Sequence, residues 1–332
     1  MMSKLRVGVI GVGKMGRLHA RAYDHFNHLC NFTGIYDPDK KAADAVARHY
    51  EVTAFSSARE LLANVDAVTI AAPTDSHFEL AKLALEHGVH VLVEKPVCRT
   101  VDEARRLMEL AEQHDDLVVQ VGHIERFNPA VQELEKIIQE QKIIAIDVRR
   151  TAPYDPRVKD LDVIQDMMVH DIDIVRHLTG AEIAELSAYG RRVKSEAFAD
   201  HAVCAARLDN DVIVTFTASR VTEQKSRVMT ITCENAFIEM DYMDRRLSLT
   251  RDARLHYNGS DDARKLENVG ERIFVPDQEP LLAQTKHFLD CIRMGCQPLI
   301  GVADGLAALE VVERIQAAVY KEALPSVDSV AV

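Results

Sequence analysis

The chain has 332 residues, 47% of them hydrophobic and 28% charged, a balance typical of a folded globular protein. This length suits two domains better than a single core. The formal net charge of -12 argues against nucleic acid and anionic membranes as partners, because both repel an acidic surface. No apolar run approaches the roughly 20 residues that cross a bilayer, and the apolar N-terminus runs straight into a glycine turn, so we expect a cytoplasmic protein.

Six cysteines are scattered along the chain, and none forms a Cys-x-x-Cys pair. We therefore expect free thiols in a reducing compartment rather than a disulfide framework. The same spacing gives no zinc signature, and no metal is expected. The six positions are Cys30, Cys98, Cys204, Cys233, Cys291 and Cys296.

Short apolar runs alternate with helical patterns over roughly the first 120 residues, which predicts a parallel sheet with helices on both faces. The expected strands are residues 5–10, 32–36, 65–71, 89–93 and 117–121, and the expected helices are 15–26, 40–49, 76–87 and 101–114.

The pattern changes after Gly122, where two helices and a strand are followed mainly by strands. The tripeptide Asp209-Asn210-Asp211 predicts a hairpin turn, and the polar stretch 252–270 is expected to be a loop. The expected helices are 129–141, 167–178, 281–294 and 303–323, and the expected strands are 143–150, 186–193, 202–208, 212–218, 228–233, 237–242 and 246–249.

A glycine-rich turn, Gly11-Val12-Gly13-Lys14-Met15-Gly16, follows the first strand and opens a helix. Gly11 permits the tight turn, Gly13 lets a pyrophosphate approach the backbone, and Gly16 lets helix and strand pack closely. The start of the helix, with Lys14 and Met15, offers unpaired N–H groups and a positive dipole to phosphates. Glycines also make plain structural turns, but the strand before and the helix after favour dinucleotide binding.

Asp37 ends the next strand, 21 residues past Gly16, where a carboxylate that binds ribose is expected. A carboxylate accepts hydrogen bonds from a ribose diol and repels a 2′-phosphate, so NAD is favoured over NADP. Lys40 and Lys41 lie nearby and are able to bind a phosphate, but we interpret them as solvated residues at a helix start.

Together these patterns predict an α/β fold with an N-terminal Rossmann domain over residues 1–122. A C-terminal α+β domain over 123–332, built on a largely antiparallel open sheet, would bind substrate and mediate oligomerisation. The helix at 303–323 is a candidate to pack back on the Rossmann domain.

The tripeptide Glu94-Lys95-Pro96 follows the expected strand 89–93. Ligands of open parallel sheets collect at the carboxyl ends of the strands, so a lysine there can reach both a nicotinamide and a substrate. The alternative is an exposed charge pair.

Asp166 and His170 are four residues apart, so on a helix they share a face. A carboxylate beside an imidazole orients it and supports its protonated form, which suits a histidine that takes a proton from an alcohol. A surface ion pair has the same spacing. The apolar neighbours Met167, Met168 and Val169 indicate a largely buried helix instead. Burying a charged side chain is costly, so a charge retained there suggests a functional role.

The order of these motifs resembles that of the Gfo/Idh/MocA family, NAD(P)-dependent oxidoreductases of sugars and cyclitols. The resemblance implies that Lys95 lies between cofactor and substrate, that His170 is the acid/base, and that Asp166 is its neighbour in the site. One departure is the run 160–164, where many members carry glycines; it would reshape the substrate pocket. The motifs are Gly11 to Gly16, Pro73-Thr74-Asp75-Ser76-His77, Glu94-Lys95-Pro96, Arg126-Phe127-Asn128-Pro129 and Asp166 to His170.

The cofactor-binding set that follows from the motifs and this resemblance comprises Gly11, Gly13, Lys14, Met15, Gly16, Asp37, Pro73, Thr74, His77, Glu94 and Lys95. Within the family, the segments 122–129 and 168–173 resemble UDP-N-acetylglucosamine 3-dehydrogenases, which implies a UDP-sugar oxidised at a secondary hydroxyl. The substrate-binding set would be Lys95, His123, Arg126, Asn128, Arg157, Asp166 and His170. A dehydrogenase of a free sugar or cyclitol, a reductase of another carbonyl or tetrapyrrole, and a non-catalytic NAD-sensing protein remain alternatives.

The segment 212–218 is apolar on one face and partly apolar on the other, where Ile213 lies between threonines along the strand. A sheet of this kind invites a partner sheet, so we expect a homo-oligomer, either a homodimer or a homotetramer.

Overall fold

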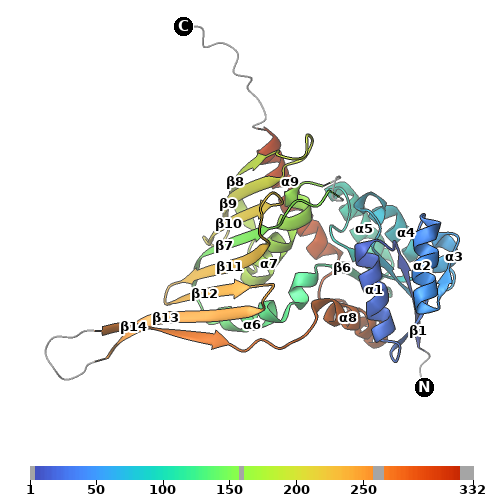
Figure 1. The fold of residues 1–332 in the computed structure, drawn as a ribbon, viewed down its shortest axis with the longest axis horizontal. Coiled ribbons are helices and arrows are strands. Elements are labelled where there is room, and N and C mark those ends of the chain that lie inside the picture. The colour runs from blue at the N-terminus through green and yellow to red at the C-terminus, as the bar shows by residue number, and fades with distance from the viewer. Residues whose placement is uncertain (1–3, 157–160, 257–264, 322–332) are drawn as a thin grey trace, which may run out of the picture. The chain divides into compact units, whose positions relative to one another are not determined.

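The computed structural model describes residues 4–156, 161–256 and 265–321 (Figure 1). The chain divides into two compact units. The first comprises Met1–Phe127 and Gln278–Glu310, and the second comprises Asn128–Asp277 and Val311–Val332. This division differs from the expected one, which assigned all residues after 122 to the second domain.

The first unit is built on a six-stranded parallel sheet in the order β3-β2-β1-β4-β5-β6. The predicted α/β architecture is confirmed. The chain leaves β1 towards β2 and β3, then returns to the other side of β1 at β4, so the sheet has a switch point between β1 and β4. The strands are β1 (Leu5–Ile10), β2 (Cys30–Tyr36), β3 (Thr53–Ala54), β4 (Ala67–Ile70), β5 (His90–Glu94) and β6 (Val119–Gly122).

Some helices of this unit begin at a side-chain cap. Asp39 accepts hydrogen bonds from two backbone N–H groups at the start of α2, and Thr100 forms a capping box with Glu103 at the start of α5. The expected set did not include the short α3 and β3. The helices are α1 (Lys14–His25), α2 (Lys40–Tyr50), α3 (Ala58–Leu62), α4 (His77–Glu86), α5 (Val101–Gln113) and α8 (Pro280–Met294), with 3-10 turns η1 (Thr74–Ser76) and η2 (Ile124–Phe127).

Helix α8 belongs to the first unit although it comes late in the chain. Its residues Phe288 and Leu289 are fully buried in the same core cluster as Val7, Tyr23 and Leu92. The hydrophobic effect of burying these side chains explains why the segment joins this unit. The amphipathic pattern of the segment predicted a helix, but the pattern does not say which sheet the helix covers.

The second unit contains an eight-stranded sheet in the order β14-β13-β12-β11-β7-β10-β9-β8. Only the β7–β10 pair is parallel, so the predicted largely antiparallel sheet is confirmed. Its strands are β7 (Ile143–Thr151), β8 (Ile183–Arg191), β9 (His201–Leu208), β10 (Ile213–Ser219), β11 (Ser226–Cys233), β12 (Ala236–Asp241), β13 (Arg246–His256) and β14 (Lys265–Ile273).

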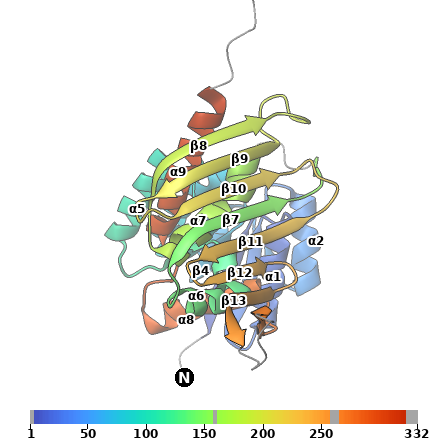
Figure 2. The same ribbon diagram turned by 90° about the vertical axis from the view of Figure 1, so that its left-hand side faces the viewer.

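One face of this sheet is covered and the other is open. Figure 2 looks onto the face that the helices of the unit, α6 (Pro129–Ile138) and α7 (Val169–Thr179), leave uncovered. Burial alternates along the strands accordingly: in β10, Val214 and Phe216 are buried, whereas Ile213 is 53% exposed. The final helix, α9 (Val302–Lys321), is shared between the two units, which divide at residue 310.

The expected loop at 252–270 is wrong at both ends, because residues 252–256 belong to β13 and 265–270 to β14; residues 257–264 lie outside the described part of the chain. Strands β13 and β14 form an antiparallel hairpin whose register pairs Leu247 with Ile273 and Thr250 with Gly270. Polar composition and a glycine predicted a loop, yet strand formation here follows from pairing with β12, which the local sequence does not reveal. Among the residues described, no helix combines the length and the apolar character needed to span a membrane.

Candidate dinucleotide and catalytic sites

The three glycines of the first turn have different surroundings. Gly11 has a φ of +87°, and a Cβ on it would lie 2.7 Å from the backbone of Ala71. A Cβ on Gly16 would lie 1.8 Å from the carbonyl oxygen of Gly11, whereas a Cβ on Gly13 would meet nothing within 4 Å. Gly11 and Gly16 therefore hold the turn against the sheet, and Gly13 leaves an open approach to the backbone.

Helix α1 begins directly after this open position. Gly13 is its N-cap, no side chain caps it, and its first turn contains no acidic residue. Lys14 is exposed and Met15 is half-buried. The first N–H groups of a helix bind anions well, because they are unpaired and lie at the positive end of the helix dipole. The geometry of the turn thus fits a pyrophosphate.

Asp37 is fixed beside the turn by the backbone. Its Oδ2 accepts a hydrogen bond from the N–H of Val12 at 2.7 Å, and its Oδ1 accepts one from the N–H of Asp39 at 2.8 Å. Each carboxylate oxygen keeps a further lone pair, so the group is still able to accept from a ribose diol. The same contacts make Asp37 part of the glycine turn itself.

The strand order places the motifs of the first unit in a row along the carboxyl edge of the sheet. Asp37 follows β2, the glycine turn follows β1, Pro73 follows β4, Lys95 follows β5, and His123 follows β6. Because neighbouring strands lie about 4.8 Å apart, the ends of β1 and β5 are separated by roughly 10 Å. A dinucleotide with its pyrophosphate on the turn and a ribose on Asp37 would direct its other half towards β4 and β5.

His77 was expected to line the cofactor cleft, but its ring is only 1% exposed. Its Nδ1 lies 2.8 Å from the carbonyl oxygen of Pro96, and its Nε2 lies 2.9 Å from that of Ala72. Burial lowers the pKa of His77, which favours the neutral ring. The imidazole therefore joins the turn after β4 to the turn after β5. Pro73 is exposed and Thr74 half-buried in the first of these turns.

Glu94 is the last residue of β5 and is 7% exposed. Its Oε1 lies 2.8 Å from Nε2 of His19 on α1, which is fully buried. Its Oε2 accepts a hydrogen bond from the backbone N–H of Lys95 at 3.3 Å. His19 was not among the predicted residues. The available signal was a histidine three residues after Gly16, on a helix face that otherwise carries Ala and Tyr.

Three predicted substrate residues follow β6 and are buried. The guanidinium of Arg126 donates to Asp304 at 3.0 Å, and Asn128 caps α6 by accepting from the N–H of Ala130 at 3.1 Å. His123 is 1% exposed. The structure therefore gives Arg126 and Asn128 contacts within the protein, which the sequence pattern did not predict.

In the second unit, Asp166 lies on a π-helical turn, η3 (Ile164–Met168), that runs into α7. The N–H of Val169 donates to the carbonyl of Ile164, five residues earlier. Asp166 and His170 are both half-buried. The expected uninterrupted α-helix at 167–178 is therefore preceded by a wider turn, a feature often found at functional sites.

Buried hydrogen bonds and an ion pair fix η3 and the start of α7. Arg150 and Asp171 form a two-fold hydrogen-bonded ion pair at 2.9 and 2.7 Å, with both side chains almost fully buried. Asp162 accepts from the backbone N–H groups of Ile164 and Gln165 through one oxygen. The predicted Arg157 lies outside the described residues.

Leu161, directly before Asp162, is also held by a hydrogen bond. Asp200 accepts from the N–H groups of Val193, Lys194 and Ser195 and from Arg220, which in turn donates to the carbonyl of Leu161. Although burial acts to raise it, these hydrogen bonds lower the pKa of Asp200 to about 2. The carboxylate therefore stays ionised and keeps its donors over the ordinary pH range.

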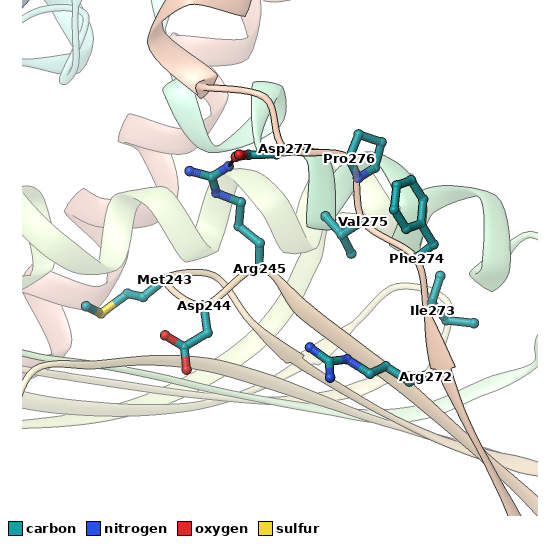
Figure 3. Close-up of a pocket in the computed structure, with 9 residues that line it drawn as sticks. All are labelled: Met243, Asp244, Arg245, Arg272, Ile273, Phe274, Val275, Pro276 and Asp277. Carbon is teal, nitrogen blue, oxygen red and sulfur yellow. Dashed lines mark hydrogen bonds and ion pairs between the residues drawn. The ribbon is translucent and has the colours of Figure 1, made fainter.

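A hollow of about 640 Å³ lies elsewhere in the second unit, between the turn after β12 and the segment after β14. Figure 3 shows Arg245 reaching Asp277 across it, an ion pair of 2.5 Å, while Phe274 is 81% exposed. None of the predicted site residues that the structure describes lines this hollow. Its lining is Met243, Asp244, Arg245, Arg272, Ile273, Phe274, Val275, Pro276 and Asp277.

Comparison with known proteins agrees with this architecture. The model of an oxidoreductase family with an NAD-binding Rossmann fold matches residues 5–123, and the GFO/IDH/MocA C-terminal domain matches residues 144–239. A UDP-N-acetylglucosamine 3-dehydrogenase of Acidithiobacillus ferrooxidans is 33% identical over 95% of this chain and 99% of that protein. A solved structure of that enzyme has a TM-score of 0.86 at 32% identity, covering 96% of this chain and 99% of that one.

Two further relatives have other substrates in their names. Inositol 2-dehydrogenase 2 of Saccharopolyspora erythraea is 32% identical over 63% of this chain and 65% of that protein. A levoglucosan dehydrogenase, solved with NADH and levoglucosan, shares the fold with a TM-score of 0.84 at 21% identity, over 97% of this chain and 98% of that one.

Proposed function

Because the chain belongs to the Gfo/Idh/MocA family of NAD(P)-dependent dehydrogenases that act on CH–OH groups, we propose that it oxidises a secondary hydroxyl of a UDP-sugar. UDP-N-acetylglucosamine, oxidised at C3, is the substrate we favour. The observation that carries this choice is the 33% identity to a UDP-N-acetylglucosamine 3-dehydrogenase, which extends through both units.

A free cyclitol is the second candidate, since an inositol 2-dehydrogenase is 32% identical. That similarity covers only 63% of this chain, against 95% for the enzyme of the UDP-sugar. The UDP-sugar is therefore the first substrate to test and inositol the second.

The proposed chemistry assigns one role to each of three residues. His170 takes the proton of the substrate hydroxyl, the task of a general base whose pKa lies near neutrality. Lys95 stabilises the negative charge that develops on the substrate oxygen. Asp166, one turn before His170, orients the imidazole. The bound nicotinamide supplies the hydride acceptor.

NAD is the proposed cofactor. The side chain of Asp37 is held in place by two backbone N–H groups, so its charge is fixed where a ribose would bind. A 2′-phosphate on that ribose would meet the carboxylate, and like charges repel.

A reducing, cytoplasmic location is also proposed. All six cysteines are free thiols, and five of them are buried. Such cysteines persist without oxidation in compartments that keep thiols reduced.

Turnover with NAD across a panel of substrates tests the proposal. The panel contains UDP-N-acetylglucosamine, UDP-glucose, free N-acetylglucosamine and myo-inositol, and the absorbance of the NADH formed is the signal. We expect the highest kcat/KM with UDP-N-acetylglucosamine, and a kcat lowered by roughly 10²-fold or more for the Lys95→Ala control. A preference for inositol would transfer the assignment to the cyclitol class, and NAD binding without turnover on any member would favour a sensing protein.

A further inference from the structure

A buried pair of side chains connects the phosphate-binding helix to the proposed catalytic lysine. His19 lies on α1, five residues after the helix begins, and Glu94 ends β5. Nε2 of His19 is 2.8 Å from Oε1 of Glu94, with His19 fully buried and Glu94 7% exposed. Both residues belong to the first unit.

The second oxygen of Glu94 faces the next residue of the chain. Oε2 accepts from the backbone N–H of Lys95 at 3.3 Å, so the carboxylate fixes the peptide that carries the lysine. Space for the carboxylate comes from Gly122, which pairs with Glu94 in the β5–β6 register. A Cβ on Gly122 would lie 3.2 Å from the carboxylate carbon of Glu94.

The carboxylate of Glu94 is ionised in this setting. Burial acts to raise the pKa of Glu94, but the hydrogen bond and the electrostatic interaction with His19, together with the charge of Lys95, outweigh it and lower the pKa below its usual value. An ionised buried carboxylate needs donors, and His19 and the Lys95 N–H are the ones at its two oxygens. Without the His19 donor, Oε1 of Glu94 would lose this hydrogen bond, which would favour rotation or protonation of the carboxyl group.

We propose that His19 is a positioning residue for Lys95 and acts through Glu94. Helix α1, whose N-terminus would bind the pyrophosphate, would then also determine where Lys95 lies relative to the nicotinamide. The proposal rests on the function proposed above for Lys95. It predicts that the position of one hydrogen-bond donor on α1 affects the turnover of the enzyme through Lys95, which follows β5, two strands away from β1.

Another buried hydrogen bond on the same face of α1 provides a control, because it joins the helix to the sheet without involving Glu94 or Lys95. Tyr23 lies one turn after His19 and is also fully buried, and its hydroxyl is 2.6 Å from that of Thr69. Thr69 lies inside β4 and is not adjacent to a proposed catalytic residue. Tyr23→Phe therefore removes a buried hydrogen bond between α1 and the sheet without touching the Glu94 turn.

Two amide substitutions of His19 distinguish the effect of where the hydrogen-bond donor lies from the effect of side-chain polarity. The amide nitrogen of Gln lies close to where Nε2 of histidine lies, so His19→Gln keeps a donor for Glu94. The amide nitrogen of Asn lies close to where Nδ1 lies, so His19→Asn keeps a similar polarity but leaves Oε1 of Glu94 without this donor. We expect His19→Asn to lower kcat by roughly 10-fold or more, because Glu94 loses the donor that holds it against the Lys95 peptide. We expect His19→Gln to stay within about 3-fold of the original protein, and Tyr23→Phe to change kcat less still.

Cofactor titration provides a readout that needs no sugar. ADP-ribose contains the pyrophosphate and both riboses of the dinucleotide but lacks the nicotinamide. We expect all three variants to bind ADP-ribose normally, and only His19→Asn to bind NADH more weakly, because it would displace the backbone of the turn after β5, which Lys95→Ala leaves in place. This result would support the proposal even if no sugar of the panel is oxidised.

Equal kcat and equal NADH affinity in His19→Asn and His19→Gln would overturn the proposal, as would a Tyr23→Phe variant that loses as much turnover as His19→Asn. If His19→Asn does not fold, Glu94→Asp carries the test, because the shorter carboxylate withdraws from His19 while both groups stay polar. Wild-type turnover in Glu94→Asp would then count against the proposal.

Discussion

Alanine at Gly13 and at Gly16 should separate cofactor binding from folding. The two glycines belong to one turn, but their surroundings differ: a Cβ on Gly13 would meet nothing within 4 Å, whereas a Cβ on Gly16 would lie 1.8 Å from the carbonyl oxygen of Gly11. The first substitution would fill the space that a pyrophosphate needs. The second would push helix α1 away from the turn.

The expected magnitudes follow from these surroundings. Gly13 has a φ of -63°, which alanine adopts without strain, so Gly13→Ala should leave the free energy of unfolding unchanged or raise it by about 0.4–1 kcal/mol. Its affinity for NADH should fall by roughly 10- to 150-fold, the equivalent of one hydrogen bond to a charged group. Gly16→Ala should destabilise the protein by about 1–3 kcal/mol or more, because backbone atoms must move to relieve the overlap.

Thermal unfolding of the protein without cofactor and fluorescence titration with NADH measure the two effects separately. Gly13→Ala should unfold at the temperature of the original protein and bind NADH poorly. Gly16→Ala should unfold several degrees lower. Normal NADH affinity in Gly13→Ala would show that the pyrophosphate does not approach the backbone at this position, and a large loss of stability would show that the position is not open.

Three further predictions concern the cofactor, the chemistry and the assembly. Asp37→Ala should weaken NAD binding and raise the ratio of NADP to NAD efficiency, measured as kcat/KM with each cofactor; an original protein that already uses both equally would contradict the role of the carboxylate. His170→Ala and Lys95→Ala should each lower kcat by roughly 10²-fold while NAD titrations stay normal, and Asp166→Asn should be milder; a His170→Ala variant with unchanged kcat would point to another base. The uncovered sheet face, on which Ile213 is 53% exposed, should be buried in the interface of a homodimer or homotetramer. A charged residue at position 213 should dissociate the assembly, and a monomeric mass of the original protein by light scattering at micromolar concentration would refute the prediction.

The regular elements of the first unit were predictable because each carries its own signal. The strand at residues 5–10 has the predicted limits, and helix α5 begins at the predicted Val101, where the structure shows a capping box of Thr100 and Glu103. The hairpin of β13 and β14 was missed because its partner strands, not its composition, determine it. Helix α8 was predicted as a helix, but a periodic apolar face does not identify the sheet against which it packs.

The residues of the candidate site could be located from the sequence to different degrees, depending on the kind of residue. The glycine turn and Asp37 could be located because backbone geometry dictates their spacing, and the structure gives each glycine a distinct environment. The contacts of His77 and Arg126 could not be predicted, since their partners, the carbonyls of Ala72 and Pro96 and the carboxylate of Asp304, are brought close only by the folded chain. His19 was missed for the same reason: its role depends on Glu94, 75 residues away.

The segment before His170 shows how a departure from the family pattern is accommodated by side-chain contacts. Where the family resemblance implies glycines, this chain has Asp162, whose carboxylate accepts hydrogen bonds from two backbone N–H groups at the start of η3 and from the side chains of Gln316 and Tyr320 on α9. A glycine has no side chain to make any of these bonds. Asp162 thus fixes where the π-helical turn begins, and the position of Asp166 on that turn follows from it. In this chain the start of the segment that carries the proposed base is therefore set by a buried carboxylate.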